Sequence, residues 1–82
     1  MARGLREAWD VLRPAVEKFP GQFLIPYNLA CYAAQMGQPD EAWHWLERAF
    51  KAAGNAEKVR KMALADADLT ALWPKLTAAR KA

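Results

Sequence analysis

The sequence predicts an all-α fold of about four to five helices, arranged as antiparallel helix-turn-helix hairpins. Hydrophobic residues make up 54% of the 82-residue chain and charged residues 26%, which is typical of a globular domain. Alanine is abundant, and Leu, Met, Glu, Lys and Arg, which also favour helices, supply much of the rest. Apolar residues recur at helical spacing, no alternating polar and apolar run indicates a strand, and Gly, Pro and Asn separate the segments.

The first helix is expected between Leu5 and Phe19, where apolar residues form a single stripe. Pro14 lies inside this segment. Because proline lacks a backbone N–H, we expect it to kink or split the helix near Arg13. Pro20 then ends the segment. The stripe consists of Leu5, Ala8, Trp9, Leu12, Ala15, Val16 and Phe19.

The second helix is expected over residues 23–36, with Pro26 in its first turn, where a missing N–H leaves no hydrogen bond unmade. Its apolar face is narrow and consists mostly of small residues, which let a neighbouring helix come close. Gly37 can adopt the left-handed conformation that ends a helix, and Pro39 can open the next one. The narrow face comprises Leu29, Ala30, Ala33 and either Met36 or Ala34.

The third helix is expected over residues 39–53 and the fourth over residues 56–65. Asp40 and Glu41 place negative charge at the positive N-terminal end of the third helix. Asn55 can cap the fourth. One face of the third helix carries Ala42, Trp45, Leu46, Ala49, Phe50 and Ala53.

A final helical stretch follows a break at Asp66 and Asp68. We interpret both carboxylates as helix caps rather than as a catalytic pair. Pro74 interrupts the stripe, and its Trp73, like Trp45 of the third helix, is expected in the core. The stripe consists of Leu69, Leu72, Trp73 and Leu76.

The chain contains an internal repeat, because a shift of 34 residues places residues 5–20 on residues 39–54. A period of this length with two helices per unit is typical of a helical solenoid. Most identities fall on the apolar face. They pair Glu7, Ala8 and Trp9 with Glu41, Ala42 and Trp43, Leu12 with Leu46, and Ala15 with Ala49.

These residues resemble the tetratricopeptide repeat family. Leu29 and Ala30 occupy the positions of a large and then a small residue in that family's helix A. The segment from Asp66 to Leu69 resembles the closing segment that follows the final repeat of many bacterial tetratricopeptide proteins. The helix B pattern of small, bulky and small residues is matched by Ala42, Leu46 and Ala49, and in the preceding unit by Ala8, Leu12 and Ala15.

The resemblance implies one domain over residues 1–82. Its parts are helix B of a partial repeat (5–20), a complete repeat (22–54) and degenerate capping helices (55–78). Each hairpin has an apolar face that it cannot cover alone, so neighbouring hairpins must stack. A chain with so few repeats is therefore expected to be a marginal monomer, a homodimer or a piece of a longer array.

The resemblance also implies a non-catalytic module for protein–protein interaction or oligomerisation, whose partner is another protein, a peptide or a second copy of the chain. Ligand peptides of the family lie along a concave face built by the A helices. The corresponding positions here are Tyr27, Asn28, Cys31 and Gln35. Because no Lys or Arg lies between residues 23 and 36, a clamp for a peptide carboxylate is disfavoured.

Trp9 and Trp43 occupy equivalent positions of the repeat, one residue past the core alanine. Tryptophan is enriched at binding hot spots, so both are candidates for an interface between units or with a partner. Tryptophan is also large enough to stay partly exposed in single domains, and this second interpretation remains open.

The residue types needed for catalysis or for a cofactor are sparse. Cys31 and His44 could pair as nucleophile and base, but no residue is evident that would orient the base or stabilise an oxyanion. One Cys and one His cannot supply the usual ligands of a metal ion, and the glycines are too isolated to cradle a phosphate. We therefore expect no enzyme activity, no metal and no cofactor.

The formal net charge of +3 is spread along the chain, as on an ordinary solvated surface. The alternative function is a weakly basic helical nucleic-acid-binding domain, which basic side chains converging on one face would favour. A single cysteine and the lack of a signal peptide or spanning segment point to the cytoplasm and to no membrane partner. The basic residues in question are Arg60, Lys61, Lys75, Arg80 and Lys81.

Overall fold

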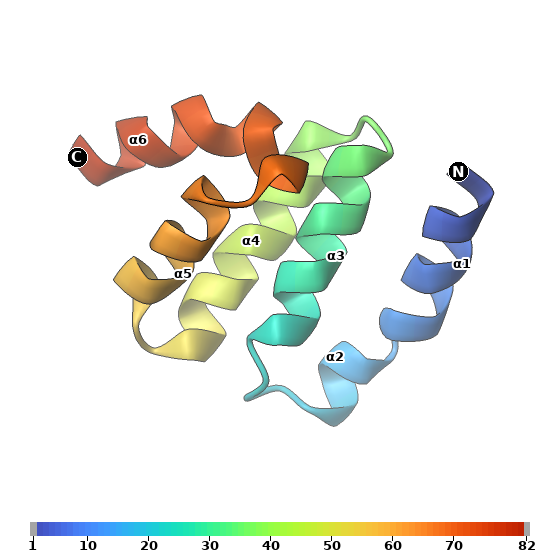
Figure 1. Cartoon of the computed structure of the whole chain (residues 1–82). Helices are drawn as coiled ribbons and strands as arrows, with labels where there is room; N and C mark the ends of the chain where they lie inside the picture. Colours follow the sequence, from blue (N-terminus) through green and yellow to red (C-terminus); the bar gives the residue numbers. More distant parts are fainter. Residues whose placement is uncertain (1, 82) are drawn as a thin grey trace.

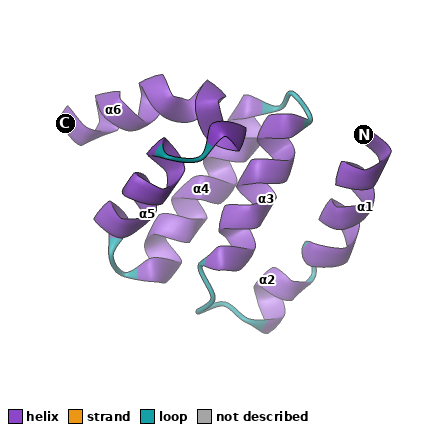
Figure 2. Ribbon diagram, viewed as in Figure 1, coloured by secondary structure: helices purple, strands orange, loops and turns teal. Residues whose placement is uncertain are grey.

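The structure, a computed structural model, describes the backbone of residues 2–81 and the side chains of residues 4–78. The described backbone is helical, with short connections and no strand, which confirms the all-α prediction (Figures 1 and 2). None of these helices combines the length and the apolarity needed to cross a bilayer. In chain order the elements are α1 (Ala2–Leu12), α2 (Ala15–Lys18), α3 (Leu24–Gln35), α4 (Pro39–Ala53), α5 (Ala56–Leu64), the 3-10 helix η1 (Ala67–Leu72) and α6 (Trp73–Lys81).

The antiparallel hairpin of α3 and α4 lies at the centre, with α1 beside α3 and α5 beside α4 (Figure 1). A Schellman motif closes the turn between them. The N–H of Gln38 donates to the carbonyl of Ala33 at 2.9 Å. The N–H of Gly37 donates to the carbonyl of Ala34 at 3.1 Å, and a φ of 78° at Gly37 is available to glycine at little cost. Pro39 then begins α4, so the predicted turn is confirmed.

Fully buried alanines line both helices of this hairpin. Ala30 and Ala33 on α3, and Ala42 and Ala49 on α4, are all 0% exposed. Because an alanine side chain ends at Cβ, the two backbones can approach closely, and larger side chains fill the space around them. The largest fully buried side chains are Leu29, Leu46, Val59, Leu69 and Leu76.

Pro14 divides the first predicted helix into α1 and α2, as expected. Helix α1 starts at Ala2, earlier than the apolar stripe predicted, because helical backbone hydrogen bonds need no apolar side chain. Helix α2 contributes Val16 to the core. Trp9 lies edge-on to Trp45 of α4, with ring centroids 5.9 Å apart. Trp45 is 2% exposed and therefore belongs to the core, as predicted.

The connections on either side of α5 use the predicted capping residues. Gly54 ends α4 with a φ of 71°, and Oδ1 of Asn55 accepts a hydrogen bond from the N–H of Lys58 at 3.2 Å. Oδ1 of Asp66 accepts from the N–H of Asp68 at 3.1 Å and caps η1. Both Asp66 and Asp68 were predicted to cap a helix, but only Asp66 does so.

The second half of the last predicted stripe, from Trp73 onward, forms a separate helix, α6. Pro74 lies in its first turn, so the chain passes from η1 into α6 without losing a helical hydrogen bond. Nε1 of Trp73 donates to the carbonyl of Ala63 on α5 at 2.8 Å. This side chain, which was predicted to lie in the core, is half-buried and packs against the core rather than lying fully inside it. A hydrogen bond from Arg60 to the carbonyl of Leu76 at 3.1 Å also joins α5 to α6.

We expect the closing segment to belong to the cooperative core. Leu69→Ala removes a fully buried side chain of η1 and should lower the free energy of unfolding by about 2–5 kcal/mol. Leu24→Ala makes the same change at a position that is 48% exposed, and should lower it by less than about 1 kcal/mol. Urea unfolding followed by circular dichroism measures both. Equal, small losses would show that η1 lies outside the core.

Candidate functional site

The four residues predicted to line a peptide groove on α3 have different surroundings. Asn28 and Gln35 are exposed, whereas Tyr27 and Cys31 are only 5% and 7% exposed. Oη of Tyr27 donates to Oδ2 of Asp66 at 3.0 Å, and Sγ of Cys31 lies 3.7 Å from the same oxygen. The closing segment thus covers part of the face that was expected to be open. Peptide contacts at Asn28 and Gln35 stay a prediction.

Asp66 controls the electrostatics of this cluster. Burial, together with the negative charge of the Asp66 carboxylate, raises the pKa of the Cys31 thiol from 9.0 to about 12. Burial and the hydrogen bond to Asp66 raise the pKa of the Tyr27 hydroxyl above its usual value in the same way. Both groups therefore stay protonated at neutral pH and act as hydrogen-bond donors.

Among the described residues, the side chains that come closest to forming a metal site belong to this same cluster. One ligand atom each from Cys31, Asp66 and Asp68 lies within 4.8 Å of the others. A metal ion would need the thiolate form of Cys31, which the neighbouring carboxylate disfavours. Since Asp66 already accepts hydrogen bonds from both α3 and η1, we assign the cluster a structural role.

Cys31 and His44, the candidate nucleophile and base, have different partners. Cys31 contacts Asp66, whereas His44 is exposed on α4 and lies edge-on to Trp45, with ring centroids 5.2 Å apart. Each side chain thus makes its contact with a third residue, and the nucleophile–base pair gains no support from this arrangement.

The two interface candidates, Trp9 and Trp43, are both half-buried against the core. Trp9 packs on Trp45, as described above. Trp43 packs edge-on to Phe50 at 6.3 Å between ring centroids, and Nζ of Lys75 on α6 lies 5.2 Å from the centre of its ring. Each tryptophan thus joins two elements of the chain itself. A role toward a partner protein stays a prediction.

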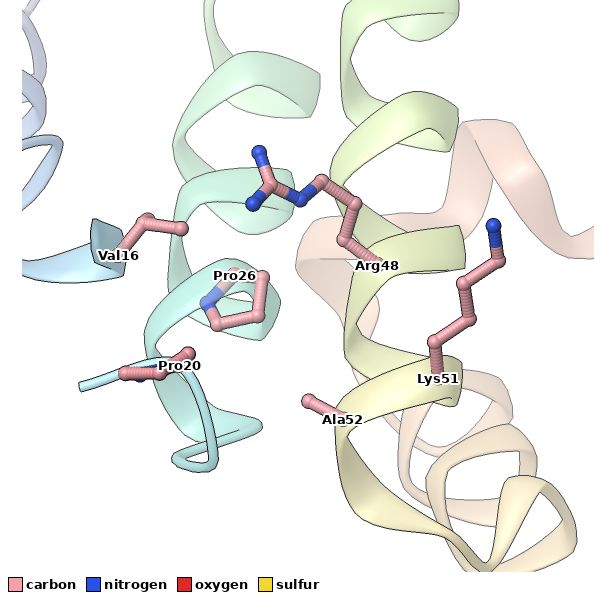
Figure 3. A pocket seen from close by; sticks show the side chains of 6 residues that line it. All are labelled: Val16, Pro20, Pro26, Arg48, Lys51 and Ala52. Carbon is pink, nitrogen blue, oxygen red and sulfur yellow. The ribbon is translucent and has the colours of Figure 1, made fainter.

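A cavity of about 250 Å³ lies between α2, α3 and α4 (Figure 3). We call it the α2–α4 groove. Its apolar lining comes from α2, the α2–α3 connection, the first turn of α3 and the last turn of α4, and its polar lining comes from two cationic side chains of α4. The lining residues are Val16, Pro20, Pro26, Arg48, Lys51 and Ala52.

The charge in this groove is uncompensated. Figure 3 shows Arg48 extending from α4 toward Val16 and Pro26, whereas Lys51 points away from them. The guanidinium of Arg48 lies 4.9 Å from the centre of the Trp45 ring, and among the described residues Arg48 has no hydrogen bond or ion pair. A second guanidinium at the same ring, that of Arg13, is paired with Glu17 at 3.1 Å.

Sequence reasoning missed this groove because each of its residues also fits a purely local pattern. Pro20 and Pro26 are typical of helix ends, and Ala52 lies off the apolar stripe of α4. One signal was present. Arg48 falls between Trp45 and Ala52 at helical spacing, which places a cation beside the buried face of the helix.

No protein-family model matches the chain, and no similar protein is found among curated proteins or solved structures.

The raised pKa values of Cys31 and Tyr27 predict that the free energy of unfolding falls in alkaline solution. Above pH 9 the unfolded chain loses the Cys31 proton while the folded chain keeps it, so stability present below pH 9 is lost as the pH rises toward 12. For this group the loss should reach about 1.4 kcal/mol at pH 10. Cys31→Ser keeps a hydrogen-bond donor but does not titrate in this range. Between pH 7 and pH 10, chemical unfolding should show a smaller loss of unfolding free energy for Cys31→Ser than for the native chain. Equal losses would contradict the prediction.

Proposed function

We propose that this chain is a non-catalytic protein-interaction module of the tetratricopeptide type, and that its α2–α4 groove receives a partner protein. The packing order supports the repeat type. Helix α1 contacts α3, α3 contacts α4 and α4 contacts α5, as in stacked helical hairpins, and η1 from further along the chain also packs on α3. The 34-residue period of the sequence agrees with this arrangement.

The groove is the observation that carries the proposal. Its volume of about 250 Å³ is below the range of roughly 300–1,000 Å³ that small-molecule sites occupy. It is large enough for one apolar side chain. Interfaces between proteins commonly concentrate their binding energy in a few such anchors, each seated in a pocket with a polar rim. The size and lining of the groove therefore favour a protein ligand over a cofactor.

Self-association is the second form of this proposal, with another copy of the chain as the partner. Three large apolar side chains are strongly exposed: Val11 at 81%, Phe19 at 54% and Leu24 at 48%. Phe19 is next to Pro20 of the groove in the chain, so a partner seated in the groove could also cover it. Isolated apolar residues are common on protein surfaces, and the groove remains the stronger argument.

Nucleic acid binding has less support. Arg60 is bound to Glu57 at 3.4 Å and to the carbonyl of Leu76, and Lys75 lies over Trp43. These cations serve contacts within the chain. The side chains of Arg80 and Lys81 lie outside the described residues.

Ala52→Trp tests the proposal, because an indole at this position fills the groove without changing the charge. Ala78→Trp places the same side chain at an exposed position of α6 and is the matched control. We expect affinity capture from the source cells and light scattering to reveal a partner or a dimer with the native chain and with Ala78→Trp. Ala52→Trp should weaken that complex roughly tenfold or more, a loss of about 1.4 kcal/mol.

Thermal unfolding of both variants establishes that they remain folded. Identical partners and affinities for the two folded variants would show that the groove is not the binding site.

A further inference from the structure

Resting on the proposed function, we infer that the α2–α4 groove is selective for an acidic segment of a partner protein, one that inserts a single apolar side chain between flanking carboxylates. The inference names the chemistry of the partner. It depends on the groove's apolar lining, on the unpaired guanidinium at its edge and on the balance of charge around it.

The apolar lining defines the anchor. Val16 is 5% exposed and Pro26 is buried, and together with Pro20 and Ala52 they present aliphatic surface to the cavity. The two proline rings are rigid, so little conformational entropy is lost when a ligand covers them. A cavity of about 250 Å³ holds one branched aliphatic side chain and leaves the ligand backbone at the rim.

Arg48 defines the charge of the ligand. Its guanidinium reaches over the groove from α4 (Figure 3), and its central carbon lies 4.9 Å from the centre of the Trp45 ring. A planar guanidinium can bind a carboxylate through two parallel hydrogen bonds, and the unused donors of Arg48 are available for this. An unpaired cation beside apolar surface thus complements an anionic group beside an apolar side chain.

The surroundings do not neutralise Arg48. Arg13, the other guanidinium at the Trp45 ring, is already bound to Glu17. The first turn of α3, which supplies Pro26, contains no acidic residue, so the positive end of that helix is uncompensated by its own sequence. Lys51 adds a second, more distant cation. Nε1 of Trp45 donates to the Glu41 carboxylate at 2.9 Å, so Glu41 and Glu17 both have partners, whereas Arg48 has no ion pair among the described residues and favours an acidic ligand.

A protein segment fits this site better than a polyanion such as nucleic acid. Binding along a phosphate backbone requires several cations in a row, since each neutralised phosphate adds to the affinity. Here one oriented guanidinium stands beside one apolar cavity. That combination suits a short peptide in which a leucine-sized side chain and a carboxylate are close together.

Three blocked pentapeptides test the inference by nuclear magnetic resonance titration of the full, isotope-labelled chain. The first probe is Glu-Glu-Leu-Glu-Glu. The second, Gln-Gln-Leu-Gln-Gln, keeps the anchor without the charge, and the third, Glu-Glu-Ala-Glu-Glu, keeps the charge without the anchor. We expect saturable shifts of the Val16, Arg48 and Ala52 amide signals with the first probe, and roughly tenfold weaker binding of the other two.

Variants at Arg48 and at one cation outside the groove refine the test. Arg48→Gln should weaken binding of the first probe roughly tenfold. Arg48→Lys should recover only part of it, because an ammonium group lacks the planar pair of donors. Lys61→Gln is the matched control, since it removes the same charge from an exposed position of α5 that does not line the groove. It should have a much smaller effect.

The outcomes separate this inference from the proposed function. Equal binding of the glutamine probe would overturn selectivity for acidic segments and leave a groove that binds protein. Equal binding of the alanine probe would overturn the apolar anchor. Shifts outside the groove, or no saturable shift with any probe, would overturn the inference altogether, and the capture experiment with Ala52→Trp would still decide the proposed function independently.

Discussion

The close approach of α3 and α4 is the constraint on which the other contacts depend. Fully buried alanines on both helices, such as Ala30 and Ala42, keep the two backbones near each other, and the Schellman turn at Gly37 fixes their antiparallel direction. The resulting unit presents two flanks. Helices α1 and α2 cover one, and α5 with the closing segment covers the other, so a change in the spacing of α3 and α4 would disturb both sets of contacts.

Two different kinds of interaction hold these flanks to the hairpin of α3 and α4. On the side of the closing segment, a single carboxylate, Asp66, accepts hydrogen bonds from α3 and from the start of η1, and Leu69 enters the core beside it. On the side of α1 and α2, Trp9 packs edge-on to Trp45, and Val16 enters the core. The α2–α4 groove remains where Val16 and the two prolines fail to fill the space beside α4. The candidate site is thus a packing gap on the flank of α1 and α2.

Local chemistry made most of the fold predictable from the sequence. Helical spacing of apolar residues identified the helices, and Gly37, Asn55 and Pro14 marked ends or breaks that the structure confirms. The surroundings of Tyr27 and Cys31 were not predictable in this way. They depend on Asp66, which is 39 and 35 residues further along the chain. The groove was missed for a similar reason, because three elements form it and no single segment carries its pattern.

The long separation between Tyr27 and Asp66 in the chain has a consequence for the order of events at the ribosome. Helices α3 and α4 are synthesised before Asp66 and can pair through local contacts, while the carboxylate that completes the cluster emerges later. The Cys31 thiol therefore gains its carboxylate partner only after the closing segment has left the ribosome and packed on α3.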